Sequence, residues 1–86
     1  MFHVYVLRSE TTGHLYTGYT SDLVQRLGQH HAGITKSTKH RGPWKLVYQE
    51  SFATRREAMR REHFLKSGQG REELKVILPS RSLSVG

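Results

Sequence analysis

The segment at residues 2–8 (FHVYVLR) constrains the fold more than any other part of the chain. It is almost continuously apolar or aromatic and rich in β-branched residues, a composition that favours a β-strand. Because the run lacks a polar face, the strand has to be covered on both sides, as a central strand of a sheet is. The sequence therefore predicts a sheet in which this segment is the central strand.

The remaining elements follow from turn signals and from the spacing of apolar residues. We expect strands at residues 2–8, 15–20 and 44–49, and helices at about 22–31, 54–66 and 71–78. Ser21 is the expected N-cap of the first helix, and Thr54 with Glu57 forms a capping box for the second. A break at Gln69 and Gly70 should separate the second helix from the third. The predicted fold class is α+β, with a three-stranded, mainly antiparallel sheet flanked by helices in the order ββαβαα.

Two features of the predicted strands carry further information, which are a glycine in the second strand and the alternation of residues in the third. Gly18 has no side chain to pack, so it indicates a bulge or the close approach of another group, and it opens space beside Tyr16. In the third strand Trp44, Leu46 and Tyr48 alternate with a more polar set of residues. Because side chains alternate along a strand, these three should share one face of the sheet.

Length and composition limit the class of protein. The 86 residues are enough for one domain, expected at residues 1–78, with a polar tail at residues 79–86. Because the chain has no cysteine, disulfides and thiolate zinc sites are excluded, and a reducing, cytoplasmic location is expected. No apolar run approaches the ~20 residues needed to cross a membrane, and the N-terminal residues lack a secretory signal pattern.

The charge balance points to a polyanionic partner. Fourteen Lys and Arg residues outnumber seven Asp and Glu residues, which gives a formal net charge of +7. Such an excess favours nucleic acid first and an acidic membrane surface second. Basic residues of the loop and the second helix suit phosphate contacts or a solvated face: Lys36, Lys39, Arg41, Arg55, Arg56, Arg60 and Arg61. Phosphate contacts give affinity without sequence information, so little base specificity is expected.

Glu62 stands out because a carboxylate is costly at its position. On the second helix Ala58, Met59 and Leu65 fall on one arc, and Glu62 projects from the middle of that arc. A buried carboxylate is unfavourable unless something pairs with it or binds it. The residues alone leave two interpretations open, which are an ion pair with a neighbouring arginine and a ligand for a metal ion in a cleft.

Four more polar side chains are expected near Glu62. Tyr5 and Tyr16 lie on adjacent predicted strands, and Arg26 and His30 lie four residues apart on one helix face. All of these groups could converge on one face of the small sheet. Each also has a plain structural interpretation, because strand tyrosines usually pack with their hydroxyls at the surface, and helix arginines and histidines are often solvated.

In these positions the chain resembles the GIY-YIG nuclease superfamily. The motifs that carry the resemblance, in the expected order, are His3-Val4-Tyr5, Tyr16-Thr17-Gly18, Arg26-Leu27 with His30, and Glu57-Ala58 with Glu62, followed by Leu65-Lys66. The glycine and isoleucine of the first signature are replaced, and its tyrosine is kept. The resemblance covers roughly residues 2–78 and is greatest to the small stand-alone bacterial members.

The resemblance implies metal-dependent hydrolysis of a nucleic-acid phosphodiester, with DNA expected ahead of RNA and with structure rather than sequence selecting the substrate. Glu62 would hold Mg²⁺ or Mn²⁺, hard ions that keep much of their water shell, and no small-molecule cofactor is implied. Arg26 would stabilise the phosphate as it gains charge. Tyr16 is slightly favoured over Tyr5 as the base, and His30 would orient a tyrosine or the phosphate, or relay a proton. A free phenol has a pKa near 10, so the base needs positive charge nearby.

One departure from the family keeps other functions open. Several members place an asparagine near the active site after the glutamate helix, and this chain contains no asparagine. The alternative function is a nucleic-acid-binding module that kept the scaffold without cleavage. A third interpretation is a structural or partner-binding domain whose charge serves solubility. Substitution of Glu62 separates the first two, and the salt dependence of binding separates the third.

Overall fold

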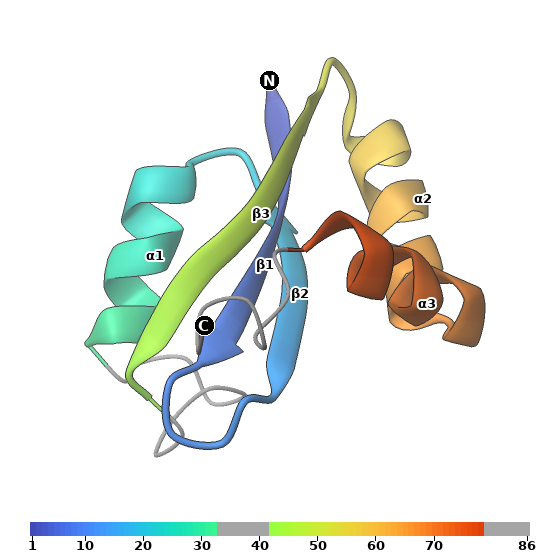
Figure 1. The fold of residues 1–86 in the computed structure, drawn as a ribbon. Helices are drawn as coiled ribbons and strands as arrows, with labels where there is room; N and C mark the ends of the chain where they lie inside the picture. The colour runs from blue at the N-terminus through green and yellow to red at the C-terminus, as the bar shows by residue number, and fades with distance from the viewer. Residues whose placement is uncertain (33–41, 79–86) are drawn as a thin grey trace.

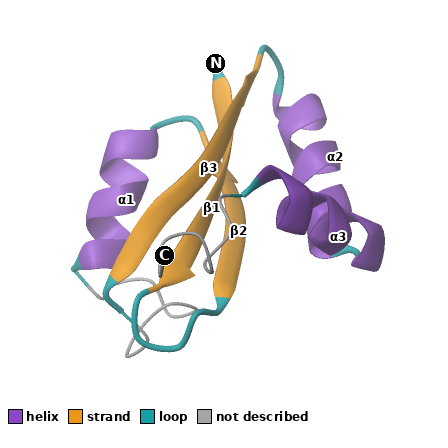
Figure 2. Ribbon diagram, viewed as in Figure 1, coloured by secondary structure: helices purple, strands orange, loops and turns teal. Residues whose placement is uncertain are grey.

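Helices cover both faces of a three-stranded sheet (Figure 1). The structure is a computed structural model that describes residues 1–32 and 42–78. The strands are β1 (Phe2–Ser9), β2 (Leu15–Thr20) and β3 (Trp44–Phe52), and the helices are α1 (Leu23–His31), α2 (Arg55–Lys66) and α3 (Gly68–Ile77). Figure 2 shows how the loops join these elements. The predicted α+β class and the order ββαβαα are confirmed.

Strand β1 is the central strand, as predicted. The sheet has the order β2-β1-β3, and β1 pairs antiparallel with both neighbours. Val4 and Val6 are fully buried in one apolar cluster with residues of α2 and α3. Tyr5 and Leu7 point to the other face and are fully buried in a second cluster, against which α1 packs. The apolar run at residues 2–8 thus supplies two cores, one on each side of the sheet.

An irregularity in β3 overturns one expectation. Val6 pairs with Tyr48 and Leu7 pairs with Leu46, so Val47 is an extra residue in the ladder. Leu46 packs in the cluster on the α1 side, whereas Tyr48 packs in the cluster on the α2 side. The prediction that Trp44, Leu46 and Tyr48 share a face is therefore wrong for Tyr48, because a bulge reverses the alternation that follows it.

The helices begin where short polar side chains accept backbone hydrogen bonds. Asp22 caps α1 and accepts a hydrogen bond from the Gln25 backbone N–H at 3.0 Å, so the prediction of Ser21 as the cap is one residue early. The predicted capping box of α2 is confirmed, with Thr54 and Glu57 bonded reciprocally.

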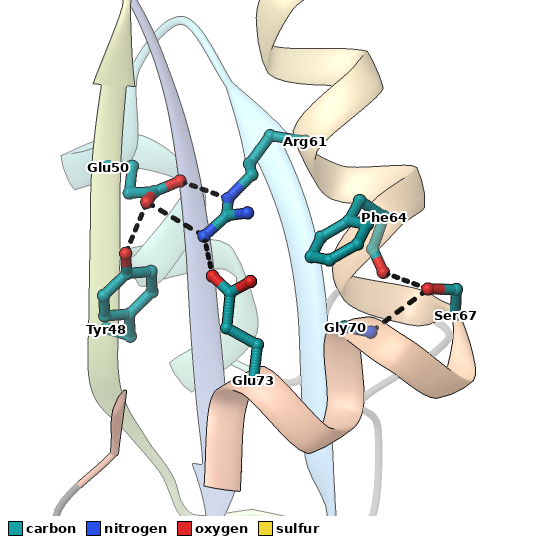
Figure 3. Close-up of polar contacts among 7 residues, drawn as sticks. All are labelled: Tyr48, Glu50, Arg61, Phe64, Ser67, Gly70 and Glu73. Carbon is teal, nitrogen blue, oxygen red and sulfur yellow. Dashed lines mark hydrogen bonds and ion pairs between the residues drawn. The ribbon is translucent and has the colours of Figure 1, made fainter. Parts of the chain in front are cut away.

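The junction between α2 and α3 also differs from the prediction. Ser67 ends α2 and caps α3, because its hydroxyl donates to the Phe64 carbonyl at 2.5 Å and accepts from the Gly70 N–H at 3.2 Å (Figure 3). A Cβ on Gly70 would lie 1.9 Å from the Phe64 carbonyl oxygen. Gly70 is thus the position at which α3 touches α2, and the predicted helix break is the first turn of α3.

Arg61 ties three elements together on the face of the sheet that α2 and α3 cover (Figure 3). From α2 its Nε and a terminal nitrogen contact both carboxylate oxygens of Glu50 on β3, at 2.8 and 3.3 Å. The same terminal nitrogen lies 2.5 Å from Glu73 on α3. The Tyr48 hydroxyl donates to Glu50 as well. This group of four side chains, the Arg61 clamp, fixes α2 against β3 and α3.

Part of the prediction lies outside the described residues. This applies to the loop residues Lys36, Lys39 and Arg41 and to the tail at residues 79–86. Within residues 1–32 and 42–78, no helix combines the length and the apolar character needed to cross a membrane.

Candidate active site

A groove of about 390 Å³, open to solvent, runs along strand β2 and its C-terminal end. Its lining comes from β1, β2, α1, α2 and the turn after β2: Phe2, Tyr5, Tyr16, Gly18, Tyr19, Thr20, Ser21, Arg26, Arg55 and Glu62. Four of the five predicted catalytic residues are among them, which are Tyr5, Tyr16, Arg26 and Glu62. The fifth, His30, is buried beneath the groove, next to Tyr5.

The predicted side chains do not meet on one face of the sheet. Helices α1 and α2 lie on opposite faces (Figure 1). Tyr5 and Tyr16 point toward the α1 side, whereas Glu62 comes from α2 on the other side. They reach a common groove because β2 is an edge strand of the sheet. The expectation of a single face is corrected to a groove that passes around this edge.

The Tyr5 hydroxyl connects α1 to the sheet. Arg26 Nε donates to Tyr5 Oη at 3.3 Å, and Tyr5 Oη lies 3.0 Å from His30 Nε2. Since the hydroxyl accepts from Arg26, we assign its own proton to the bond with His30. Arg26 is held a second time through a hydrogen bond from its terminal nitrogen to Gln29 Oε1 at 3.0 Å. The guanidinium is therefore oriented before any ligand arrives.

Burial sets the protonation states of these two groups. Desolvation raises the pKa of the Tyr5 phenol, and the hydrogen bond from Arg26 offsets this only in part. Desolvation lowers the pKa of His30, and the charges of Arg26 and His31 lower it further. A neutral imidazole that accepts from a protonated phenol fits both shifts. The hydrogen bond to Tyr5 raises the pKa of Arg26, which stays a cation.

Gly18 makes room for the Tyr5 hydroxyl. The two residues are direct partners across β1 and β2. A Cβ on Gly18 would lie 2.7 Å from Tyr5 Oη and 2.9 Å from Tyr5 Cζ. The sequence prediction of a close approach at Gly18 is confirmed, and the approaching group is the Tyr5 phenol.

Glu62 is paired, but its partner is a lysine. Its side chain is 13% exposed, and Oε2 lies 2.7 Å from Lys66 Nζ one helical turn away. His63 Nε2 is 4.0 Å from Oε1. Residues 1–32 and 42–78 contain no group of three His, Cys, Asp or Glu side chains able to enclose a metal ion. A single carboxylate that lines an open groove suits a hard divalent cation, which keeps waters and takes further oxygens from a phosphate.

The predicted phosphate-binding residues of α2 separate into two groups. Arg55 lines the groove, and its guanidinium lies 5.6 Å from the centre of the Phe2 ring. Arg56 and Arg60 are exposed, and Arg60 lies with Arg61 beside a second hollow, next to Phe64. The Arg61 guanidinium is engaged by Glu50 and Glu73 on that side. The structure therefore brings Arg55 to the groove and does not bring Arg61 there.

Sequence reasoning missed two residues of the groove wall and two partners of the groove's charged side chains. Phe2 and Tyr19 look like ordinary strand residues, and their place in the wall depends on the twist and edge of the sheet. Gln29 could have been found, because it lies three residues after Arg26 on the same helix. Lys66 could also have been found, since it follows Glu62 at the i,i+4 spacing that favours an ion pair.

Comparisons with known proteins match most of the chain. The family model of the GIY-YIG catalytic domain matches residues 1–75. A UPF0213 protein of Staphylococcus haemolyticus is 43% identical over 76 residues, which cover 87% of this chain and 92% of the relative. A UPF0213 protein of Halobacterium salinarum is 46% identical over 67 residues, covering 77% and 86%. The solution NMR structure of a UPF0213 protein from Bacillus halodurans shares 38% identity and a TM-score of 0.55, and the match covers 90% of this chain and 85% of that one.

Proposed function

The chain belongs to the GIY-YIG family of nuclease domains, and from this membership we propose that it is a divalent-metal-dependent endonuclease for nucleic-acid phosphodiester bonds. The proposed domain spans residues 1–78. DNA is the proposed substrate ahead of RNA, selected by structure rather than by sequence. The observation that carries the proposal is the groove that holds Glu62 together with Tyr5, Tyr16 and Arg26.

Glu62 is the proposed ligand of Mg²⁺ or Mn²⁺. When bound, such an ion stabilises the charge that develops on the phosphate and on the leaving 3′-oxygen. The carboxylate supplies a hard oxygen donor at the groove wall, and it comes from a helix that the Arg61 clamp holds against β3 and α3. The Glu62 side chain is thus placed by a rigid element, as a metal ligand should be.

Arg26 is the proposed partner of the phosphate oxygens. Its hydrogen bonds to Tyr5 and Gln29 orient the guanidinium, and the remaining N–H groups can donate to non-bridging oxygens. Donors that are already oriented need no rearrangement as the phosphate gains charge, which is the condition for strong transition-state stabilisation.

Tyr16 is the proposed base that positions the attacking water and takes its proton at the phenolic oxygen. Tyr5 suits this role less well, because it is fully buried, hydrogen-bonded to His30 and raised in pKa by desolvation. Tyr16 lines the groove and is only partly buried. The role left to Tyr5 and His30 is to hold Arg26 and the floor of the site in place.

The experiment that tests this function compares Glu62→Gln with the wild type on branched, nicked, single-stranded and duplex substrates, with Mg²⁺, Mn²⁺ or a chelator. Cleavage should fall by about 10²–10³-fold, because the charge that the cation needs is gone. The melting temperature and metal-free binding should change little, because glutamine keeps the shape of Glu62 and i,i+4 pairs on helices contribute about 0.3–0.5 kcal/mol. The matched control is Glu72→Gln, which removes the exposed pair with Lys75 and should cleave normally.

Two outcomes would contradict the proposal. A Glu62→Gln variant that melts much lower yet cleaves normally would make Glu62 a structural ion-pair partner. A wild-type protein that binds nucleic acid with a steep salt dependence and cleaves nothing in the panel would be a binding module on the same scaffold. A cytoplasmic location also remains a prediction.

A further inference from the structure

Lys66 occupies the carboxylate that the proposed function assigns to a metal ion. Its ammonium lies 2.7 Å from Glu62 Oε2, and the pair spans one turn of α2. The two side chains differ in exposure, with 51% for Lys66 and 13% for Glu62. Lys66 is therefore the more exposed member of the pair, and its ammonium already neutralises one oxygen of a carboxylate that lines the groove.

We propose that Lys66 is a resident counter-cation of Glu62, which a divalent metal must displace and which keeps the metal affinity of the free protein low. This inference rests on the proposed function, because it takes Glu62 as the metal ligand. It concerns a residue for which that function gives no role.

The charges around the groove make this competition effective. Among the residues that the structure describes, Glu62 is the only acidic side chain that lines it, whereas Arg26 and Arg55 both line it as cations. A dication that enters this groove is attracted by the single negative charge of Glu62. The ion pair with Lys66 weakens that attraction. Each positive charge held within several ångströms of a dication weakens its binding. Removal of Lys66 frees one carboxylate oxygen and removes one repulsive charge at the same time.

Lys66 can also leave without disturbing the fold. It is the last residue of α2, and its side chain is half exposed at the end of a flexible four-carbon stem. A surface i,i+4 pair shifts an equilibrium by no more than about two- to threefold. A phosphate placed in the groove offers the ammonium another partner and gives the metal further oxygen ligands. Nucleic acid should therefore strengthen metal binding by relieving the competition, and the metal should strengthen nucleic-acid binding by the same factor.

The test is a Mn²⁺ titration of the full chain without nucleic acid. The electron paramagnetic resonance signal of free Mn²⁺ is measured at each point of the titration. We expect Lys66→Met to bind Mn²⁺ about three- to tenfold more tightly than the wild type, of which the lost ion pair accounts for about two- to threefold and the lost repulsion for the rest. Lys66→Gln serves as a second neutral variant, in case the methionine alters solubility. Lys66→Arg keeps the charge and should bind Mn²⁺ no more tightly than the wild type. Lys75→Met is the matched control, because it removes a lysine from an exposed Lys–Glu pair on α3 and should change nothing.

The outcomes separate this inference from the function on which it rests. If Glu62→Gln loses Mn²⁺ binding while both neutral Lys66 variants bind like the wild type or more weakly, the metal site stands and the role of Lys66 is overturned. If Glu62→Gln binds Mn²⁺ as well as the wild type does, the metal assignment itself fails and the inference falls with it. Equal tightening in Lys66→Met and Lys75→Met would show an effect of net charge alone and would also overturn it.

Discussion

At the scale of single residues, the Tyr5 hydroxyl is the point at which two predicted catalytic side chains, Arg26 and His30, meet. It accepts from Arg26, donates to His30 and fits against Gly18 across the strand pair. Because Tyr5 is fully buried, a change at any of these three neighbours is felt at the other two. Two predictions follow from this arrangement.

The first concerns the space at Gly18. Gly18→Ala places a methyl group 2.7 Å from Tyr5 Oη, so the phenol must shift in a packed interior. We expect a loss of about 1–3 kcal/mol in the free energy of unfolding, measured by urea denaturation, and a weaker bond between Tyr5 and His30. Gly28→Ala is the control, because Gly28 is exposed on α1 and nothing lies within 4 Å of the added methyl. Gly28→Ala should raise the free energy of unfolding by about 0.5–1 kcal/mol. A Gly18→Ala variant as stable as Gly28→Ala would refute the close approach of Tyr5 to Gly18.

The second prediction concerns pH. Burial, then Arg26 and His31, lower the pKa of His30 in the folded protein below its value in the unfolded chain. As the pH falls, the unfolded state therefore binds a proton at His30 before the folded state does. The stability that is present above the unfolded pKa of about 6.5 is lost as the pH falls below that value. The urea midpoint of the wild type should drop between about pH 7.5 and 5.

His30→Gln should make this decline shallower, since the titrating group is gone. The control His14→Gln replaces an exposed histidine of the β1–β2 turn and should leave the pH dependence unchanged. If His30→Gln and the wild type lose stability in parallel over this range, then His30 is not the group responsible.

At the scale of elements, α2 serves two sides of the molecule with adjacent residues. Glu62 faces the groove, and Arg61 faces Glu50 on β3 and Glu73 on α3 (Figure 3). Burial alone would lower the pKa of Arg61, but its hydrogen bonds to the two glutamates raise it, so the guanidinium is strongly held as a cation. The clamp thereby sets the rotation and height of α2, and with them the position of the Glu62 carboxylate.

Arg61→Met tests the clamp. It leaves Glu50 and Glu73 close together in partly buried positions without a cation between them. We expect a loss of about 1–3 kcal/mol in the free energy of unfolding, measured in urea. Glu72→Gln is the control, and it should change stability by less than about 0.5 kcal/mol because its pair with Lys75 is exposed. An Arg61→Met variant as stable as this control would show that packing alone holds α2.

Elements with a strong local signal were predictable, and those that depend on partners were not. The apolar run at residues 2–8 and the capping box at Thr54 are local patterns, and both are confirmed. The first turn of α3 looked like a break because glycine disfavours helices, yet Gly70 is required by contact with the Phe64 carbonyl. The β3 bulge, which moves Tyr48 to the other face, leaves no mark in the alternation.

For the candidate site the same distinction holds. Residue types, spacing and the resemblance to the GIY-YIG superfamily together selected Tyr5, Tyr16, Arg26 and Glu62, and the structure gathers them in one groove. Their meeting around a sheet edge was beyond sequence reasoning, because it depends on which strand is left at the edge and on α2 crossing to the other face.

At the scale of the whole molecule, the groove lies between two helical layers, and its cations come from both. Arg26 is contributed by α1 and Arg55 by α2, on opposite sides of the sheet. A phosphate backbone that follows the groove would thus touch both layers. Affinity should then depend on salt and very little on base sequence.

Arg55→Gln tests this arrangement. Binding should weaken by a similar factor for all sequences, and the slope of log K against log salt concentration should decrease by about 1, as expected for one lost phosphate contact. Arg71→Gln removes the same charge from an exposed position on α3 outside the groove lining, so it controls for net charge. A loss of affinity confined to one sequence would indicate base recognition. Equal salt slopes for Arg55→Gln and Arg71→Gln would place the nucleic acid outside the groove.

The position of Phe2 has a practical consequence for protein production. Phe2 forms part of the groove wall, and Met1 before it is 72% exposed. An affinity tag fused in front of Met1 would therefore start one residue from the groove and could lie across its mouth. A protein purified with such a tag could be scored as inactive for a reason unrelated to its chemistry, so assays should use material from which the tag has been cleaved.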